Sequence, residues 1–178
     1  MGIKESASKN SQIDEKTNPK ATRPHVPSVY GVPQADEGLL PWSYVTQRMT
    51  EAKCYWLSTV DAESQPYATP IDGLWHKGTL YFGGSPRTRW SRNLSQNPSL
   101  CVHLESGIDV VILRGEAVEM KGMERELAET LARASYEKYG YAPKPEEYEN
   151  SDGVYAFYPR IVLAWQQFPQ DATRWEIA

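Results

Sequence analysis

Cysteine, histidine and long apolar runs are all scarce in this 178-residue chain. Its two cysteines, Cys54 and Cys101, are too few for a disulfide framework or a zinc site. Both lie in apolar stretches, where reduced thiols are typical of cytoplasmic proteins, so we expect a cytoplasmic location. No apolar run approaches the roughly 18 residues of a membrane-spanning helix, and the start of the chain lacks the apolar segment of a secretory signal.

Known catalytic motifs are absent as well. The chain contains no nucleophile elbow, zinc-binding helix motif, Walker loop or dinucleotide-binding glycine motif. Its three histidines, His25, His76 and His103, lie far apart in sequence. We therefore assign no catalytic residue and no metal ligand. If the protein is an enzyme, a cofactor should supply the difficult chemistry.

The charge balance argues against two classes of partner. The chain carries 19 basic and 23 acidic side chains, which gives a formal net charge of −4. Nucleic acids and anionic membranes bind cationic surfaces, so we expect neither as a partner. The hydrophobic fraction of 40%, with six tryptophans and eleven tyrosines, is typical of a globular domain.

The chain divides at about residue 38. Residues 1–38 carry equal numbers of acidic and basic side chains, several prolines and serines, and no hydrophobic periodicity. This composition predicts a flexible N-terminal arm. From residue 39 onward helical and strand periodicities are readable, so residues 39–178 are predicted to form one domain.

Short β-strands dominate that domain. Runs of aromatic and β-branched residues, separated by hairpin-sized turns, indicate an antiparallel sheet rather than a parallel one. The predicted strands are 54–60, 66–75, 79–82, 99–105 and 109–120, with a final hairpin of 154–158 and 161–168. Apolar spacing and capping residues predict helices at 39–53, 86–96 and 123–139. The expected fold class is mostly β with α, a barrel of six or seven strands with added helices.

A long loop is predicted at residues 140–153. It contains two prolines and two tyrosines. Loops of this length serve as lids or binding loops, or simply cover the surface, and the sequence leaves both interpretations open.

One stretch of the chain lacks acidic residues. No Asp or Glu lies between Asp72 and Glu105. The same stretch holds four basic residues: Lys77, Arg87, Arg89 and Arg92. It also holds a predicted strand that leads through Gly83, Gly84 and Ser85 into a helix. Glycines let a backbone approach a ligand closely, and a helix N-terminus attracts anions.

The helix spacing supports an anion site. Arg89, Arg92 and Asn93 are expected on one helix face, where guanidinium groups can hold phosphate oxygens. A simpler interpretation is equally open: Ser85 is an ordinary N-cap, Pro86 is an ordinary first helical residue, and the arginines pair with acids elsewhere. The pattern alone does not identify the anion.

Several short motifs follow one another in order between Tyr55 and Met120. They are a strand with Ala68-Thr69-Pro70, an aromatic strand, a helix with Arg92-Asn93-Leu94 before Asn97-Pro98, and a strand with Arg114-Gly115-Glu116-Ala117. No single motif is diagnostic, but their ordered combination resembles the pyridoxamine 5'-phosphate oxidase-like, FMN-binding split-barrel family.

The resemblance implies a six- to seven-stranded antiparallel split β-barrel that forms a homodimer, with flavin mononucleotide (FMN) in two grooves at the interface. The flavin ring would lie along Ala68, Thr69, Pro70 and Ile71. The flavin phosphate would meet the strand–turn–helix element, which here comprises Gly83, Gly84, Ser85, Arg87, Thr88, Arg89 and Arg92. Aromatic residues of the partner chain would close the site, and the candidates are Trp165 and Trp175.

The chain departs from the family pattern at three places. Thr88-Arg89-Trp90 stands where many members have Ser-Arg-Lys, so Trp90 is either a ligand or a core residue. Asp72-Gly73 and Arg174-Trp175-Glu176 stand where the oxidase has basic residues for the phosphate of its vitamin substrate. We therefore expect an FMN-dependent oxidoreductase that acts on another small molecule and is not a genuine pyridoxamine-phosphate oxidase.

Three alternatives stay open. A deazaflavin-dependent reductase of the same fold would use the same arginine-rich groove. A flavin- or haem-binding carrier or sensor would bind its cofactor without turnover. A barrel without ligand would serve only as a dimeric interaction module.

Overall fold

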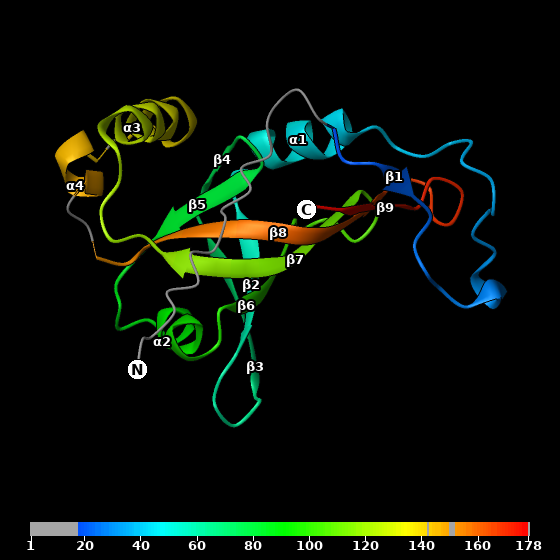
Figure 1. Ribbon diagram of the computed structural model, residues 1–178, viewed down its shortest axis with the longest axis horizontal. Helices are drawn as coiled ribbons and strands as arrows, with labels where there is room; N and C mark the ends of the chain where they lie inside the picture. Colours follow the sequence, from blue (N-terminus) through cyan, green and yellow to red (C-terminus); the bar gives the residue numbers. More distant parts are fainter. Residues whose placement is uncertain (1–17, 142, 150–151, 178) are drawn as a thin grey trace, which may run out of the picture.

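A computed structural model describes residues 18–141, 143–149 and 152–177 of the chain (Figure 1). The strands are β1 (Ala21–Thr22), β2 (Tyr55–Val60), β3 (Pro66–Ile71), β4 (Leu74–His76), β5 (Thr79–Gly83), β6 (Ser99–His103), β7 (Val110–Glu119), β8 (Val154–Trp165) and β9 (Thr173–Glu176). The helices are α1 (Trp42–Glu51), α2 (Arg89–Gln96), α3 (Arg125–Tyr139) and α4 (Pro145–Glu149), with a 3₁₀ turn at Ser28–Tyr30. None of these helices is long and apolar enough to cross a membrane.

All of these strands join one antiparallel sheet, and the long strand β8 organises it. The main path runs β1-β9-β8-β7-β6-β2-β3, and the β4–β5 hairpin joins through β5 and β8. One side of β8 pairs with β7, whereas the other side pairs with β5 near its start and with β9 near its end. Because β8 pairs with two different strands on one side, the sheet curls without closing into a complete barrel. This confirms the predicted split barrel, with nine described strands rather than six or seven.

The predicted C-terminal hairpin is wrong, because Pro159 and Arg160 run inside β8 rather than in a turn. The register between β7 and β8 shifts here: Arg114 faces Ile161 and Gly115 faces Pro159, so Arg160 is an extra residue. Such a bulge accommodates a proline, which cannot donate a ladder hydrogen bond. The Arg160 carbonyl instead accepts a hydrogen bond from the Ile177 amide at 2.9 Å.

The core lies on the inner face of the curled sheet. In β2 the alternate residues Tyr55, Leu57 and Thr59 are buried, as expected for a strand with one covered face. Helix α1 covers one end of this face with Trp42, Val45 and Met49.

The second half of the predicted N-terminal arm lies against the domain. Strand β1 pairs with β9, and the Arg23 guanidinium donates hydrogen bonds to the carbonyls of Ala35 (2.9 Å) and Gln170 (2.8 Å). Residues 18–38 therefore differ from the flexible arm that the composition predicts. The rest of the arm, residues 1–17, lies outside the described residues.

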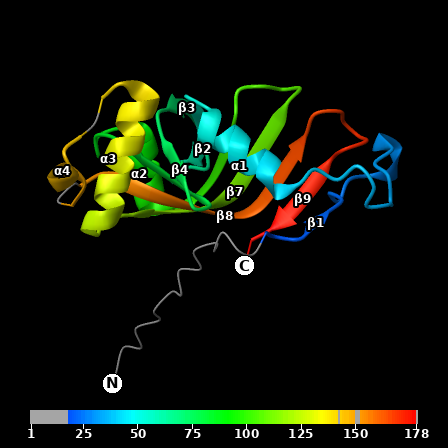
Figure 2. The same cartoon turned by 90° about the horizontal axis from the view of Figure 1, so that it is seen from above.

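The helices lie at different edges of the sheet. In Figure 1, α1 and α3 lie along the upper edge, whereas α2 and the β2–β3 hairpin lie at the lower edge. Figure 2 shows α4 at one end of the molecule, with β1 and β9 toward the other end. The predicted helices 39–53, 86–96 and 123–139 correspond to α1, α2 and α3 with shifted ends.

We predict that Gly115→Ala destabilises the protein by about 2 kcal/mol, the usual cost of overpacking a filled interior. A Cβ atom at Gly115 would lie 2.0 Å from the Tyr158 carbonyl oxygen and 2.8 Å from the Pro159 Cα, both of which are backbone atoms. Urea denaturation measures this loss. Gly107→Ala is the matched control, because a Cβ there meets no atom within 4 Å and should change stability by no more than about 0.5 kcal/mol. Equal stability of the two variants would contradict the bulge geometry.

Candidate cofactor site

Helix α2 is fixed to the sheet by its inner face. It begins at Arg89, and the Thr88 hydroxyl caps it by accepting a hydrogen bond from the Ser91 amide. The predicted start at residue 86 and the predicted Ser85 cap are therefore wrong. The Asn93 side-chain amide donates to the Thr59 hydroxyl at 3.0 Å, and both side chains are buried. Asn93 thus faces the core and does not share the face of the arginines.

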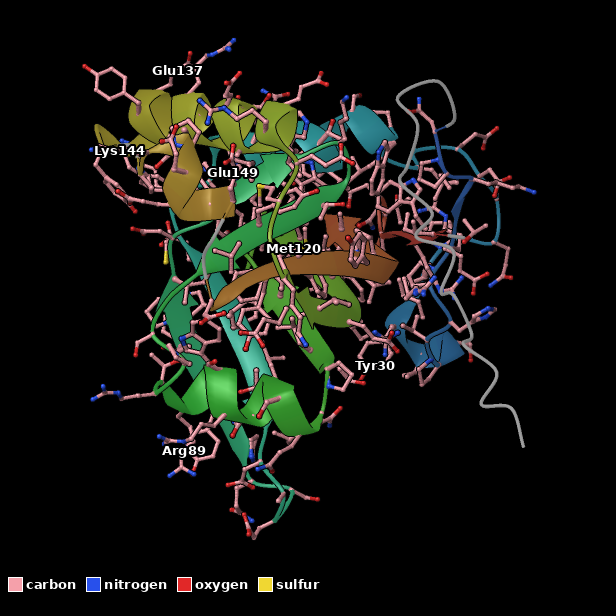
Figure 3. The ribbon with its side chains drawn as sticks, turned by 60° about the vertical axis from the view of Figure 1, so that its left-hand side comes forward. Tyr30, Arg89, Met120, Glu137, Lys144 and Glu149 are labelled. Carbon is pink, nitrogen blue, oxygen red and sulfur yellow. The ribbon has the colours of Figure 1, made fainter. Side chains whose placement is uncertain are left out.

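Arg89 and Arg92 point outward on the opposite face of α2, as their spacing predicts. The Arg92 guanidinium donates to the Arg87 carbonyl at 2.8 Å, which ties the helix to the preceding turn. The Arg89 guanidinium lies 4.9 Å from the centre of the Tyr67 ring and 3.8 Å from an Asp61 carboxylate oxygen. Its side chain remains 52% exposed despite these two contacts. Figure 3 shows Arg89 beside α2, far from α3 and α4.

The two turn glycines serve packing. The Gly84 amide donates to the Gly153 carbonyl at 3.1 Å, which links the turn to the start of β8. A Cβ at Gly84 would lie 2.9 Å from the Trp90 ring, and one at Gly83 would lie 3.4 Å from the Gly153 carbonyl oxygen. Both glycines are nevertheless exposed on their other side, together with Ser85 and Arg87.

Trp90 is a core residue. Its side chain is 8% exposed, and its ring meets those of Phe82 and Tyr155 at centroid distances of 5.5 and 5.4 Å. The indole that replaces a family lysine therefore fills the space beneath the turn and is not available to a phosphate.

Strand β3 is an open edge beside this turn. Among the described residues it pairs only with β2, and it carries exposed or half-buried residues along its whole length. Thr69 and Ile71 pair with the buried residues Leu57 and Tyr55, so they lie on the inner face, whereas Ala68 and Pro70 lie on the outer face. The contact between Arg89 and Tyr67 brings the start of β3 next to α2.

The structure thus brings most of the predicted cofactor residues to one edge and places two elsewhere. The contact of Arg89 with Tyr67 joins α2 to the start of β3, whereas Trp165 and Trp175 lie on β8 and β9. Trp165 is half-buried against Phe168 and stays a candidate for a partner's site. Trp175 is fully buried against Trp42 at 5.6 Å, so it cannot reach a neighbouring chain.

Sequence reasoning missed a pocket on the other side of β5. This pocket, of about 290 Å³, lies where α3 and α4 approach β4 and β5. Its lining is mostly aromatic and aliphatic: Asp72, Gly73, Leu74, Tyr81, Phe82, Gly83, Ser135, Tyr139, Tyr141, Pro143, Glu147, Tyr148 and Val154. The described part of the predicted loop 140–153 therefore contains a short helix and forms one wall of a cavity.

Ion pairs hold that wall in place. The Arg125 guanidinium of α3 donates to Glu129 on its own helix, and to Glu146 (2.8 Å) and Glu149 (3.1 Å) on α4. Figure 3 shows α4, with Glu149, beside α3.

Beside the pocket lies Lys138, a half-buried lysine that the sequence analysis also missed. Its ammonium group donates to the Tyr55 hydroxyl at 2.7 Å and to the Gly73 carbonyl at 3.2 Å. Burial lowers the pKa of Lys138 to about 8, and the nearby Asp72 carboxylate opposes this shift. Lys138 continues the apolar stripe of α3 four residues after Ala134, and this spacing is the signal that could have identified it.

We predict that Lys138 makes the stability of the protein rise with pH. Between its folded pKa of about 8 and its ordinary value of 10.5, the unfolded chain binds more protons than the folded one. Urea denaturation should therefore show that the wild type gains stability relative to Lys138→Met between about pH 7 and about pH 9.5. Lys144→Met, which removes an exposed lysine, should keep the wild-type pH dependence. Parallel pH profiles of the wild type and Lys138→Met would contradict the assignment.

Comparisons with solved structures agree with the fold. A conserved hypothetical protein from Mycobacterium tuberculosis is 14% identical with a TM-score of 0.59, over 75% of this chain and 89% of that one. An F420 reductase is 14% identical with a TM-score of 0.51, over 75% and 100% of the two chains. HutZ, a haem storage protein from Vibrio cholerae, is 18% identical with a TM-score of 0.51, over 66% and 88%.

Sequence comparison identifies the family. No curated protein sequence matches the chain. A family model described as pyridoxamine 5'-phosphate oxidase matches residues 45–163, which is well over half of the chain and includes β3, the turn 83–88 and α2. The chain therefore belongs to the pyridoxamine 5'-phosphate oxidase-like family of split barrels.

Proposed function

We propose that the protein is a homodimeric oxidoreductase that binds FMN at the edge formed by β3, the turn 83–88 and α2. One observation carries this proposal: the exposed Arg89 of α2 lies over the Tyr67 ring of the edge strand β3, and the exposed Arg87 and Arg92 lie in the same turn and helix. We name Arg87, Arg89 and Arg92 the arginine corner. A cationic surface next to an exposed, partly apolar edge strand suits a molecule that has an anionic end and a flat ring.

The phosphate would be held by the turn and the start of α2. Arg87, Arg89 and Arg92 offer guanidinium forks, which bind phosphate oxygens with charge-assisted hydrogen bonds. The helix begins at Arg89, and its N-terminal amides and dipole favour an anion. The Ser85 hydroxyl, which accepts from the Arg87 amide, adds a donor in the same turn, whereas the Thr88 hydroxyl already donates to the Ser85 carbonyl.

The ring would be oriented by β3. Ala68, Thr69, Pro70 and Ile71 present an edge strand whose backbone is free on one side, and backbone groups can hydrogen-bond the polar edge of a flavin. A bound flavin supplies the hydride- and electron-transfer chemistry, while the residues of this chain bind it, orient it and limit its access to water. No side chain is assigned a catalytic role.

The homodimer would form through the outer face of the sheet. Trp56, His103, Ile112 and Leu163 are directly paired neighbours across β2, β6, β7 and β8, and each is only half-buried in the single chain. The Trp56 and His103 rings stack at 6.3 Å. We name these four residues the outer row. A row of large, partly exposed side chains on a sheet face is typical of a protein interface.

A deazaflavin is the second candidate cofactor. The three arginines extend along α2 and its turn, so they could also hold a cofactor with a longer anionic tail. The similarity to an F420 reductase supports this alternative. Reduction of the bound cofactor by a nicotinamide or a deazaflavin donor would distinguish an enzyme from a carrier or sensor.

For the cofactor we predict that Arg89→Ala weakens FMN binding by about 2 kcal/mol, or roughly 30-fold in Kd, because it removes a charged hydrogen-bond donor. Fluorescence titration of FMN into apoprotein measures this change. Arg133→Ala, which removes an exposed arginine from α3, is the matched control and should leave Kd unchanged. An unchanged Kd in Arg89→Ala would place the phosphate elsewhere.

For the homodimer we predict that Ile112→Glu converts the protein to a monomer, because it buries a carboxylate at the centre of the outer row. Size-exclusion chromatography with light scattering measures the mass, and the circular dichroism spectrum should stay unchanged. Tyr136→Glu adds the same charge on α3, at a side chain that is 65% exposed, and should remain dimeric. A wild type that is monomeric, or an Ile112→Glu variant that stays dimeric, would overturn this interface.

A further inference from the structure

The pocket between α3–α4 and β4–β5 carries a charge opposite to that of the arginine corner. We propose that it binds a flat aromatic molecule that is neutral or cationic, and that it rejects anions. That this molecule is the substrate rests on the proposed function. That the pocket binds it rests only on the residues that line the pocket.

Aromatic side chains form most of these walls. The Tyr139 and Tyr141 rings stack on each other at 5.8 Å with an interplanar angle of 27°. Tyr81 and Leu74 form the floor from the hairpin side and are each 7% exposed, while Tyr148 lines the pocket from α4. Flat apolar faces favour a planar ring, and electron-rich tyrosine faces attract cations.

The charged groups of the pocket are both acidic. Asp72 and Glu147 are exposed at the pocket, and no lysine or arginine is among its lining residues. The Lys138 ammonium lies close by, 5.5 Å from the centre of the Tyr139 ring, and donates to the Tyr55 hydroxyl and the Gly73 carbonyl. A cationic ligand would therefore meet two carboxylates, whereas an anionic ligand would be repelled by both.

Three of the hydroxyl groups in the wall already have hydrogen-bond partners. The Tyr139 hydroxyl donates to the Gly73 carbonyl at 2.9 Å and accepts from the Gly73 amide at 3.0 Å. The Ser135 hydroxyl donates to the Tyr141 carbonyl at 2.8 Å, and the Tyr141 hydroxyl donates to the Asp72 carboxylate at 3.4 Å. None of these groups is placed to offer its proton to a phosphate or carboxylate, which a site for an anionic ligand would require.

The pocket adjoins the proposed cofactor edge. Gly83 lies both in its lining and in the turn that leads to α2, and Asp72 directly follows the ring strand β3. A volume of about 290 Å³ is at the small end for ligand pockets and suits one or two fused rings. A molecule bound here would lie next to the end of β3, in a position suited to a substrate.

Two probes that share a ring and differ in charge test this inference. Tryptamine and indole-3-acetate are titrated separately into the purified full chain by isothermal titration calorimetry at neutral pH. We expect tryptamine to bind about tenfold more tightly than indole-3-acetate, because it is attracted rather than repelled by two carboxylates. Absence of tryptamine binding, or equal or tighter binding of indole-3-acetate, would overturn the proposal.

Three variants test which residues bind the probes and which produce the charge preference. Asp72→Asn/Glu147→Gln should remove most of the charge preference, and Tyr148→Ala should weaken both probes while keeping the preference. Glu126→Gln, which removes an exposed carboxylate from the first turn of α3, should behave as the wild type. Persistence of the full preference in the double variant would contradict the assigned pocket.

A parallel titration with FMN separates this inference from the proposed function. Tryptamine binding without FMN binding would support the pocket and refute the cofactor site. FMN binding without tryptamine binding would support the cofactor site and refute the pocket.

Discussion

Two buried hydrogen bonds, from the Asn93 amide to the Thr59 hydroxyl and between the Ser91 and Tyr155 hydroxyls, set the orientation of α2 on the sheet. All four groups lie in the core, where an unpaired amide or hydroxyl is costly, so the helix is held in one rotation. In that rotation Trp90 faces inward, and Arg89 and Arg92 face outward. The position of the cationic corner is therefore a consequence of core packing, and the proposed cofactor site depends on it.

The end of β5 separates two environments of opposite charge. On one side the turn after Gly83 carries exposed arginines, and on the other the pocket carries exposed carboxylates and tyrosine rings. Under the proposed function, the first environment holds the anionic end of a cofactor and the second admits a ring without negative charge. The two surfaces would thus bind ligands of different charge at neighbouring positions along one edge of the sheet.

Much of the fold is predictable from local pattern, whereas long-range pairing is not. The aromatic and β-branched run 54–60 and the acid-free stretch 73–104 correctly indicate β2 and a cationic turn that leads into a helix. The Pro159-Arg160 pair looks like a turn, and only its pairing with Gly115 on β7 makes it a bulge. Likewise, Asn93 has the spacing of an outward residue, and only Thr59, distant in sequence, turns it inward. The pocket was missed for the same reason, since α3, α4 and β5 meet only in the folded chain.

The proposed function depends on Arg87, Arg89 and Arg92 holding the phosphorylated end of a redox cofactor. The most direct test is mass spectrometry, with an absorption spectrum, of the small molecule released by denaturing the purified protein. The account predicts FMN at about one molecule per chain, or uptake of FMN to that ratio after reconstitution. Release of haem, or a protein that remains colourless and takes up neither FMN nor a deazaflavin, would contradict it.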